Sequence, residues 1–352
     1  MSERLYDLKQ NLPELFELES LIERAGSKMR CSVIANAPFD GSTLPVHLLE
    51  MGSTDPLAPA IGFVGGVHGV ERIGSQVILA YLQSLLSRMR WDDSLQDQLD
   101  KVKLFMIPIV NPGGMFNNTR CNPNGIDLMR NAPIEAKGKV PKLLGGHRYS
   151  RHLPWYRGLK EDCMEPELQG LHDYMRQHVL GRPFTMTLDC HSGFGFHDRL
   201  WFPYAGSFTP IADLNTMYRV NRLFVKTFPN HTLYKVEPQA HSYTTHGDVW
   251  DLLYDHSLEA YPNTTFLPLT LEMGSWLWVK KNPRQLLKFG SLFNPMLPHR
   301  QRRILRRHYP LMDFMMMATR SHSRWQKLKP TQVSKDTRAA LKLWYDEEGH
   351  SK

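Results

Sequence analysis

The chain has 352 residues, of which 41% are hydrophobic and 22% are charged. This balance excludes an intrinsically disordered chain and supplies enough apolar residues for a sizeable core. The net charge of +8 permits an anionic partner, although the basic residues are spread along the chain apart from one dense run near the C-terminus.

Four cysteines lie far apart along the chain, and no CxxC pair occurs among them. In a chain of this length, that spacing predicts reduced thiols rather than a disulfide framework. The N-terminal segment is charged throughout and lacks the apolar core of a secretory signal, and no apolar run is long enough to span a membrane. We therefore expect a cytoplasmic protein that does not engage a membrane.

The first half of the chain alternates between helical and strand-like patterns. Residues 3–26 have leucines near helical spacing, and Pro13 can divide this stretch in two. An amphipathic helix is expected over residues 71–90, between the last two of four apolar strands. The strands are predicted at 29–36, 45–51, 60–67 and 103–110. Such an order predicts βαβ units and a largely parallel sheet.

The second half begins with a long irregular segment, residues 131–163, which is rich in Pro, Gly, Lys and Arg. We interpret it as a surface excursion that can form a rim around a site. Regular patterns then return, with helices expected at 165–178, 210–228 and 298–319 and strands at 184–190, 231–237 and 266–272. The chain is therefore predicted to be an α/β protein with one domain. Its parts are a domain over 1–325, with an N-terminal helical segment at 1–26 and a basic helix at about 298–319, and a polar tail at 326–352.

Two of the predicted strands end in residues that can bind a metal ion. The first runs through two glycines into His68 and Glu71, and His191 directly follows the strand at 184–190. Ligands of open α/β sheets bind beyond the carboxyl ends of the strands, so these side chains can converge there. An HxxE pair alone arises often by chance. Two histidines and one carboxylate together, however, form a ligand set of catalytic zinc sites.

A third strand ends in Glu272, which either faces solvent or lies in the same crevice as the metal site. In the second case it can take the proton of a metal-bound water. Arg120 and Arg130 lie in a loop dense in Asn, Pro and Gly. They are either ordinary exposed cations or a fixed pair that binds carboxylates and oxyanions.

On these residues the chain resembles the zinc metallocarboxypeptidases of the carboxypeptidase A superfamily, in the bacterial cytosolic style. The resemblance covers about residues 60–275. Its motifs are HGVE (68–71), NPGG (111–114), NGIDLMRN (124–131), MEPELQGL (164–171), DCHSG (189–193), SYTTHGDVWDLLY (242–254) and TLEMG (270–274).

The resemblance implies a fold and a catalytic site. The fold is an α/β/α sandwich around a mixed, mostly parallel twisted sheet of about eight strands. One Zn²⁺ ion would be bound by His68, Glu71 and His191. Glu272 would be the general base and then the acid that protonates the leaving amine, and Arg120 would stabilise the oxyanion.

The resemblance also implies residues that bind substrate. Arg130 would hold the terminal carboxylate of the substrate, and Tyr243 would close over it. Trp250 would line the specificity pocket, or it could equally be a core residue on a short helix. The family commonly has Asn-Arg where this chain has Met129-Arg130. One hydrogen-bonding partner of the terminal carboxylate is therefore missing, which leaves the requirement for a free carboxylate open.

Three functions remain as alternatives. The first is a zinc-dependent metallocarboxypeptidase. The second is a zinc amidohydrolase acting on murein peptides or N-acyl amino acids, and the third is a non-catalytic binding protein of the same fold. The expected partner is a peptide or small amide, without nucleic acid and without an obligate protein partner.

Two further features have alternative interpretations. The basic run at 299–310 could contact nucleic acid or anionic lipid, but we expect a solvated helix face there. Asp189, two residues before His191, could orient that metal ligand.

Overall fold

The computed structural model describes residues 3–161, 163–287, 289–327 and 329–346. Its strands form one sheet of eight in the order β1-β2-β4-β3-β5-β8-β6-β7. β2 is antiparallel to β1 and β4, β6 is antiparallel to β8, and the other neighbours are parallel. The strands are β1 (Arg30–Phe39), β2 (Ser42–Gly52), β3 (Ala60–Gly65), β4 (Lys103–Ile107), β5 (Phe184–Ser192), β6 (Asp198–Phe202), β7 (Tyr234–Pro238) and β8 (Thr265–Met273). The predicted mixed, mostly parallel sheet is therefore confirmed.

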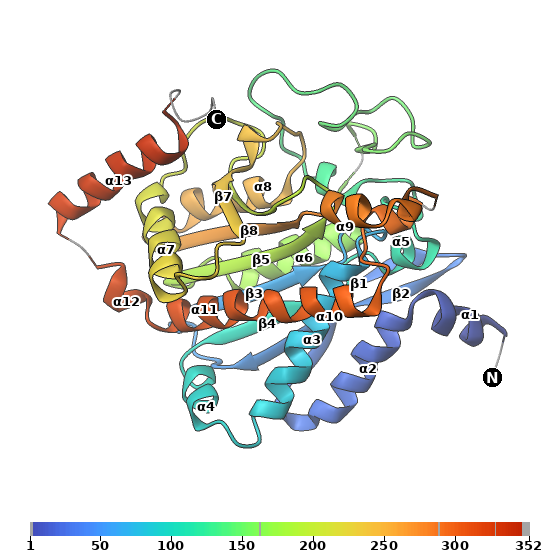
Figure 1. The fold of residues 1–352 in the computed structure, drawn as a ribbon, viewed down its shortest axis with the longest axis horizontal. Coiled ribbons are helices and arrows are strands. Elements are labelled where there is room, and N and C mark those ends of the chain that lie inside the picture. Colours follow the sequence, from blue (N-terminus) through green and yellow to red (C-terminus); the bar gives the residue numbers. More distant parts are fainter. Residues whose placement is uncertain (1–2, 162, 288, 328, 347–352) are drawn as a thin grey trace.

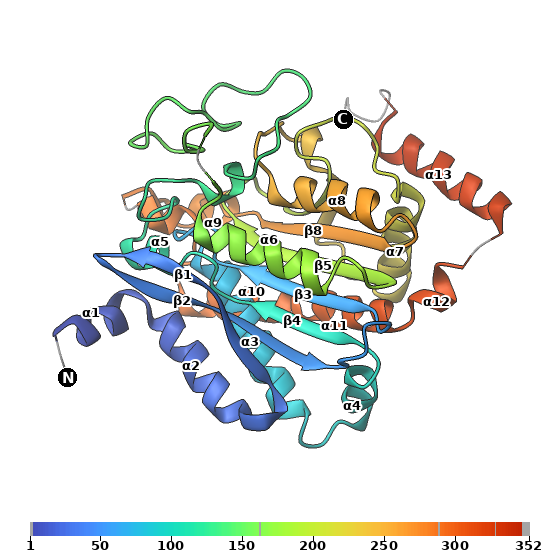
Figure 2. The same ribbon diagram turned by 180° about the vertical axis from the view of Figure 1, so that it is seen from behind.

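Helices cover both faces of the sheet, and Figure 1 looks onto one of them. That face carries α2 (Pro13–Ala25), α3 (Arg72–Arg88), α10 (Pro298–Arg307) and α11 (Tyr309–Arg320). Figure 2 shows the other face, which carries α6 (Pro166–His178) and α8 (Val249–Ala260). The remaining α-helices are α1 (Glu3–Asn11), α4 (Asp93–Leu99), α5 (Pro112–Asn117), α7 (Leu214–Thr227), α9 (Trp276–Lys281), α12 (His322–Trp325) and α13 (Pro330–Trp344).

The central strands β3, β5 and β8 are buried along their whole length. A parallel strand that is covered on both faces needs an apolar run rather than an alternating pattern, which is what these three segments have. They run parallel as neighbours, so their carboxyl ends meet at one edge of the sheet. That edge is where the predicted metal ligands lie.

Several elements differ from the sequence expectation. The helix predicted over 298–319 is two helices, because α10 ends at Arg307 and Pro310, which lacks an N–H, lies in the first turn of α11. The segment predicted as a polar tail contains α13, whose Trp344 is buried and packs its ring against Phe202. The break at Pro13 is confirmed, since α1 ends at Asn11 and α2 begins at Pro13.

The segment predicted as a surface excursion is irregular, as expected. The segment follows the 3-10 helix that ends at Arg130. Its described residues form short turns, and one isolated bridge joins His147 to Tyr156. All four cysteines are free thiols. Within the described ranges, no helix has the length and apolar character needed to cross a bilayer.

Candidate metal centre

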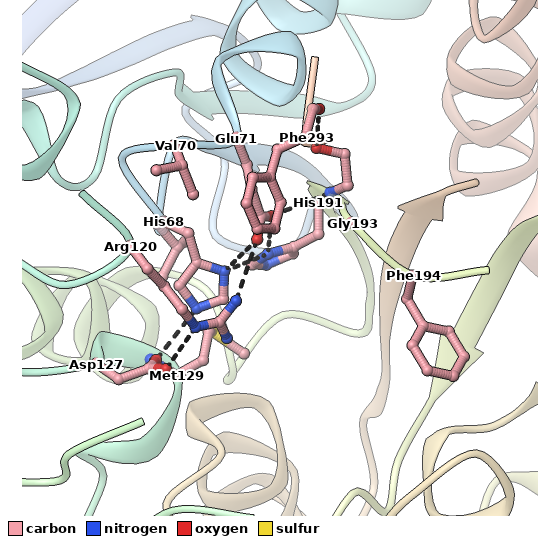
Figure 3. A network of polar contacts seen from close by, with 12 residues as sticks. His68, Val70, Glu71, Arg120, Asp127, Met129, His191, Gly193, Phe194 and Phe293 are labelled. Atoms are coloured by element: carbon pink, nitrogen blue, oxygen red, sulfur yellow. Dashed lines mark hydrogen bonds and ion pairs between the residues drawn. The ribbon is translucent and has the colours of Figure 1, made fainter. Parts of the chain in front are cut away.

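His68, Glu71 and His191 come together at the carboxyl ends of β3 and β5. His68 follows β3, Glu71 is the N-cap residue of α3, and His191 lies near the end of β5. The Nδ1 atom of His68 is 2.9 Å from Oε1 of Glu71, and the Nδ1 atom of His191 is 3.0 Å from Oε2. All three side chains are buried, and one donor atom from each lies within 4.8 Å of the others. Figure 3 shows the three side chains pointing toward one another.

Glycines allow the backbone to approach closely enough for this convergence. A Cβ atom on Gly69 would lie 2.0 Å from the carbonyl carbon of Gly114, and one on Gly74 would lie 2.1 Å from the carbonyl oxygen of Cys190. Gly74 therefore lets the first turn of α3 pack directly on β5. This contact between α3 and β5 brings the carboxylate of Glu71 within hydrogen-bonding distance of His191.

Each histidine is held by a buried carboxylate on its far side. Nε2 of His68 is 3.1 Å from Oδ1 of Asp127, and Nε2 of His191 is 2.8 Å from Oδ2 of Asp189. Such contacts fix the ring orientation and leave the other nitrogen free to bind a metal. The orienting role considered for Asp189 is thus consistent with its position.

Of the two positions expected for Trp250, in the specificity pocket or in the core on a short helix, the structure shows the second. Trp250 is 3% exposed in the core, and its Nε1 donates a hydrogen bond of 2.9 Å to Oδ2 of Asp189. It contacts Asp189 behind the candidate ligand His191 and is not among the residues that line the cavity of the site. Sequence spacing could not reveal this, because the direction of a side chain on α8 depends on how that helix packs on the sheet.

The charges at the centre favour a bound cation. Glu71, Asp127 and Asp189 are buried, and Arg120 contacts two of them. Its Nε is 2.8 Å from Oδ2 of Asp127, and its Nη1 is 3.3 Å from Oε1 of Glu71. If a bound metal replaced the protons of the two imidazoles, three carboxylates and one guanidinium would leave two negative charges. Buried charge of this kind requires compensation, and a divalent ion would provide it.

The carboxyl groups of Glu71 and Glu272 have pKa values shifted in opposite directions. Burial raises the pKa of Glu71, but His68 and His191 outweigh that effect and hold it well below its usual range. Burial, together with the charge of Glu71, raises the pKa of Glu272 to about 8. Groups whose environments separate their pKa values in this way are suited to different roles, one as a charged ligand and one as a carrier of a proton.

Glu272 lies in the crevice and not at the surface. It pairs in register with His191 across β8 and β5, and its Oε1 accepts a hydrogen bond of 2.9 Å from the backbone N–H of Phe194. A cavity of about 290 Å³ joins it to the three candidate metal ligands. The sequence hypothesis that three strand ends share one crevice is therefore consistent with the geometry.

The predicted substrate residues also line this cavity, with the exception of Trp250. The predicted members are Arg120, Met129, Arg130 and Tyr243. Arg130 is 2% exposed; it donates to the carbonyl groups of Leu144 and Met129. Its Nη2 is buried without a well-aligned hydrogen-bond partner in the described part of the chain. A guanidinium left in this state can bind a carboxylate.

Other lining residues were not predicted. They include Trp201 on β6, Phe293 beyond β8, and Leu144, Pro154 and Trp155 on the excursion. Trp155 has a φ of +67°, which is unusual for a residue other than glycine. The excursion was predicted as a rim, but no motif identified which of its residues would face the cavity.

Comparisons with known proteins show the family of this chain. Residues 23–275 match the family model described as zinc carboxypeptidase. Carboxypeptidase SOL1 of Arabidopsis thaliana is 23% identical over 272 residues, which cover 71% of this chain and 48% of that protein. The human carboxypeptidase N catalytic chain is 24% identical over 210 residues, which cover 56% of this chain and 42% of that protein. The chain thus spans about half the length of the curated relatives it matches.

Solved structures show the same fold. A carboxypeptidase A from Helicoverpa armigera superposes with a TM-score of 0.65 at 15% identity, over 87% of this chain and 72% of that chain. Bovine thrombin-activatable fibrinolysis inhibitor, solved with a tick carboxypeptidase inhibitor, gives a TM-score of 0.61 at 17% identity, over 90% and 98%. At these identities the likeness concerns the fold alone.

Proposed function

This chain belongs to the zinc carboxypeptidase family, and from that premise we propose that it hydrolyses the C-terminal peptide bond of peptides. The observation that supports this most is the convergence of His68, Glu71 and His191, with one donor atom from each within 4.8 Å of the others. Glu272 lies beside them in the same cavity. A ligand set with a neighbouring carboxyl group is suited to the metal-assisted hydrolysis of an amide.

The residues that would hold a single zinc ion are His68 and His191, through Nδ1, and Glu71, through its carboxylate. When bound, zinc acidifies a water and polarises the carbonyl group of the substrate. Glu272 takes the proton of the attacking water and later transfers it to the leaving amine. The pKa of its carboxyl group, which burial raises to about 8, supports this role as a carrier of the proton.

Two arginines would act on different oxygens of the substrate. Arg120 reaches the candidate ligands through Glu71, so it can stabilise the negative charge that develops on the carbonyl oxygen. Arg130 offers its buried Nη2 to the terminal carboxylate. Tyr243, whose ring contacts Phe194 and Trp201, would cover the bound substrate.

A second function is favoured by Met129. This residue lines the cavity and is 4% exposed, and its thioether has no N–H to donate to a carboxylate. A substrate carboxylate would therefore depend on Arg130 without a neighbouring amide. A zinc amidohydrolase that cleaves murein peptides or N-acyl amino acids is the alternative. A binding protein without catalysis is the third possibility.

The test compares the wild type with Glu272→Gln, using zinc analysis and hydrolysis of blocked dipeptides. The variant should keep its zinc and lose activity by about 10²–10⁴-fold, the usual contribution of a general base. Unchanged activity would exclude the assignment of Glu272. Substrates amidated at the C-terminus separate the first two functions, because a carboxypeptidase should not cleave them. A wild type that binds zinc but cleaves neither class would support the third.

A further inference from the structure

The segment between β8 and the middle of α11 carries positive charge without negative charge. Residues 274–312 contain nine lysines and arginines and no aspartate or glutamate. Most of the cations that the structure describes there are exposed to solvent. The exposed ones are Lys280, Lys281, Arg284, Arg302, Arg303 and Arg306. Among the described cations of this segment, only Arg307 has an acidic partner, which is Asp198.

The same segment exposes large apolar side chains. Leu286 is 65% exposed, Leu287 is 84% exposed, Met296 is 52% exposed and Trp276 is 46% exposed. An ordinary solvated helix face mixes both signs of charge and does not gather leucines among its cations. Exposed apolar side chains that are surrounded by polar groups mark an interaction site.

These side chains lie on α9, on the segment that follows it and on α10, and we call the described residues 274–287 and 290–307 the α9–α10 face. α9 and α10 both lie in the foreground of Figure 1, and Arg300 of α10 donates hydrogen bonds to the carbonyl groups of Trp278 and Lys281 in α9. A mainly apolar cavity of about 440 Å³ opens on this face beside Trp276 and Leu286. It shares Gly193 and Phe293 with the cavity of the candidate metal centre.

We propose that the α9–α10 face binds the surface of an anionic lipid bilayer. Its arginines and lysines would contact the headgroups, and Leu286 and Leu287 would enter the boundary between headgroups and acyl chains. Peripheral proteins bind anionic membranes through this combination of buried apolar area and electrostatic attraction. Nucleic acid would match the charge, but its phosphate backbone would leave the leucines without an apolar partner.

This inference replaces the expectation that the basic run at 299–310 is a solvated helix face without a membrane. It also places the candidate metal centre next to a bilayer. It does not depend on the proposed hydrolysis, because the face and the catalytic residues are different side chains.

The test is flotation of the full chain with large vesicles of phosphatidylcholine, with and without 30% phosphatidylglycerol, at 50 and 150 mM NaCl. The wild type should bind only the anionic vesicles, and more tightly at the lower salt. Arg302→Ser/Arg303→Ser/Arg306→Ser should weaken binding by about a hundredfold, since each residue near the surface contributes about fivefold. The double variant Leu286→Ser/Leu287→Ser should weaken it by about tenfold or more.

A matched control removes three exposed cations from α13, with Lys335→Ser/Arg338→Ser/Lys342→Ser. This variant should bind as the wild type does, within about twofold. Thermal unfolding and zinc content equal to those of the wild type would establish that each variant is folded. Three results would overturn the proposal: no binding to anionic vesicles at 50 mM NaCl, binding that the leucine variant leaves unchanged, or tighter binding to a 25-base-pair DNA duplex than to the vesicles.

Discussion

Each histidine of the candidate metal centre turns Nδ1 toward the other ligands and Nε2 toward a buried carboxylate. For His191 that carboxylate is Asp189, which in turn accepts the hydrogen bond of Trp250. We expect Trp250→Phe to keep the fold and to weaken zinc binding by about 10–100-fold, because Asp189 loses the donor that fixes its position. Competition with a chromogenic chelator measures the zinc affinity.

Trp344→Phe is the matched control for that prediction. Trp344 is also 3% exposed, and its Nε1 donates to the carbonyl group of Val236, which lies outside the metal centre. Both variants lose one buried indole donor, at a similar cost in stability of about 1–3 kcal/mol. Only the variant at Trp250 should lose zinc affinity. Equal affinities would show that Asp189 does not need the indole.

The burial of the Glu167 carboxyl group, in the first turn of α6, should make the stability of the protein depend on pH. It is fully buried, and burial raises its pKa to about 7 despite a hydrogen bond from Asn122. An unfolded glutamate titrates near 4.3, so between these values the folded state binds more protons. This group therefore lowers the free energy of unfolding as the pH rises from about 4 to about 7.

Replacing this carboxyl group by an amide should remove the effect. Glu167→Gln keeps an acceptor for Asn122 and stays neutral, so we expect it to be more stable than the wild type by about 3–4 kcal/mol at pH 8. The difference should vanish near pH 4. Urea unfolding at both pH values measures it. A constant difference across this range would mean that Glu167 does not titrate as its burial implies.

Single residues of the site were predictable where a motif ties them to a strand end, as for His68, His191 and Glu272. Those that act through tertiary packing were not. The side chain of Trp250 points toward Asp189 because of how α8 packs on the sheet. The side chain of Trp155 lines the cavity because of the conformation of an irregular loop. No local pattern encodes either direction.

At the scale of elements, the contact between α3 and β5 positions the ligands. A methyl group on Gly74 would lie 2.1 Å from the carbonyl oxygen of Cys190, and this backbone atom cannot move away alone. Gly74→Ala should therefore push α3 off β5, destabilise the protein by about 3 kcal/mol or more, and weaken zinc binding by displacing Glu71. Thermal unfolding and zinc titration test both effects.

Ser87→Ala, on the exposed side of the same helix, serves as the control. It should change the stability by less than about 0.5 kcal/mol and leave zinc binding unaltered. If Gly74→Ala behaved in the same way, the close packing of α3 on β5 would not be what holds Glu71 in place.

Elements were predictable where burial gives a long apolar run, as in β3, β5 and β8. The short strand β6 was not predicted, and α8 was considered only as a short helix around Trp250. β6 spans only Asp198–Phe202 and is antiparallel to β8, so its pairing depends on a partner far along the chain. The break between α10 and α11 was missed because the apolar residues on either side of Pro310 keep a helical period.

At the scale of the whole molecule, the candidate metal centre joins elements from distant parts of the chain. The loop between β3 and α3 contributes His68 and Glu71, β5 contributes His191 and β8 contributes Glu272, and buried carboxylates lie where these elements meet. Arg120 compensates only part of this negative charge, so a metal that binds only the folded state should stabilise the entire domain. At a free zinc concentration of a hundred times the Kd, the free energy of unfolding should rise by about 2.7 kcal/mol.

Thermal unfolding with zinc, and after its removal by a chelator, measures this linkage. The midpoint should fall by a few degrees on removal and recover when zinc is restored. His68→Ala should unfold at the same temperature with and without zinc, because the imidazole that completes the ligand set is missing. A zinc-dependent rise of equal size in that variant would place the stabilising ion elsewhere in the molecule. If the zinc-dependent rise in the unfolding midpoint is lost only in the variant, the stabilising ion binds at the site that includes His68.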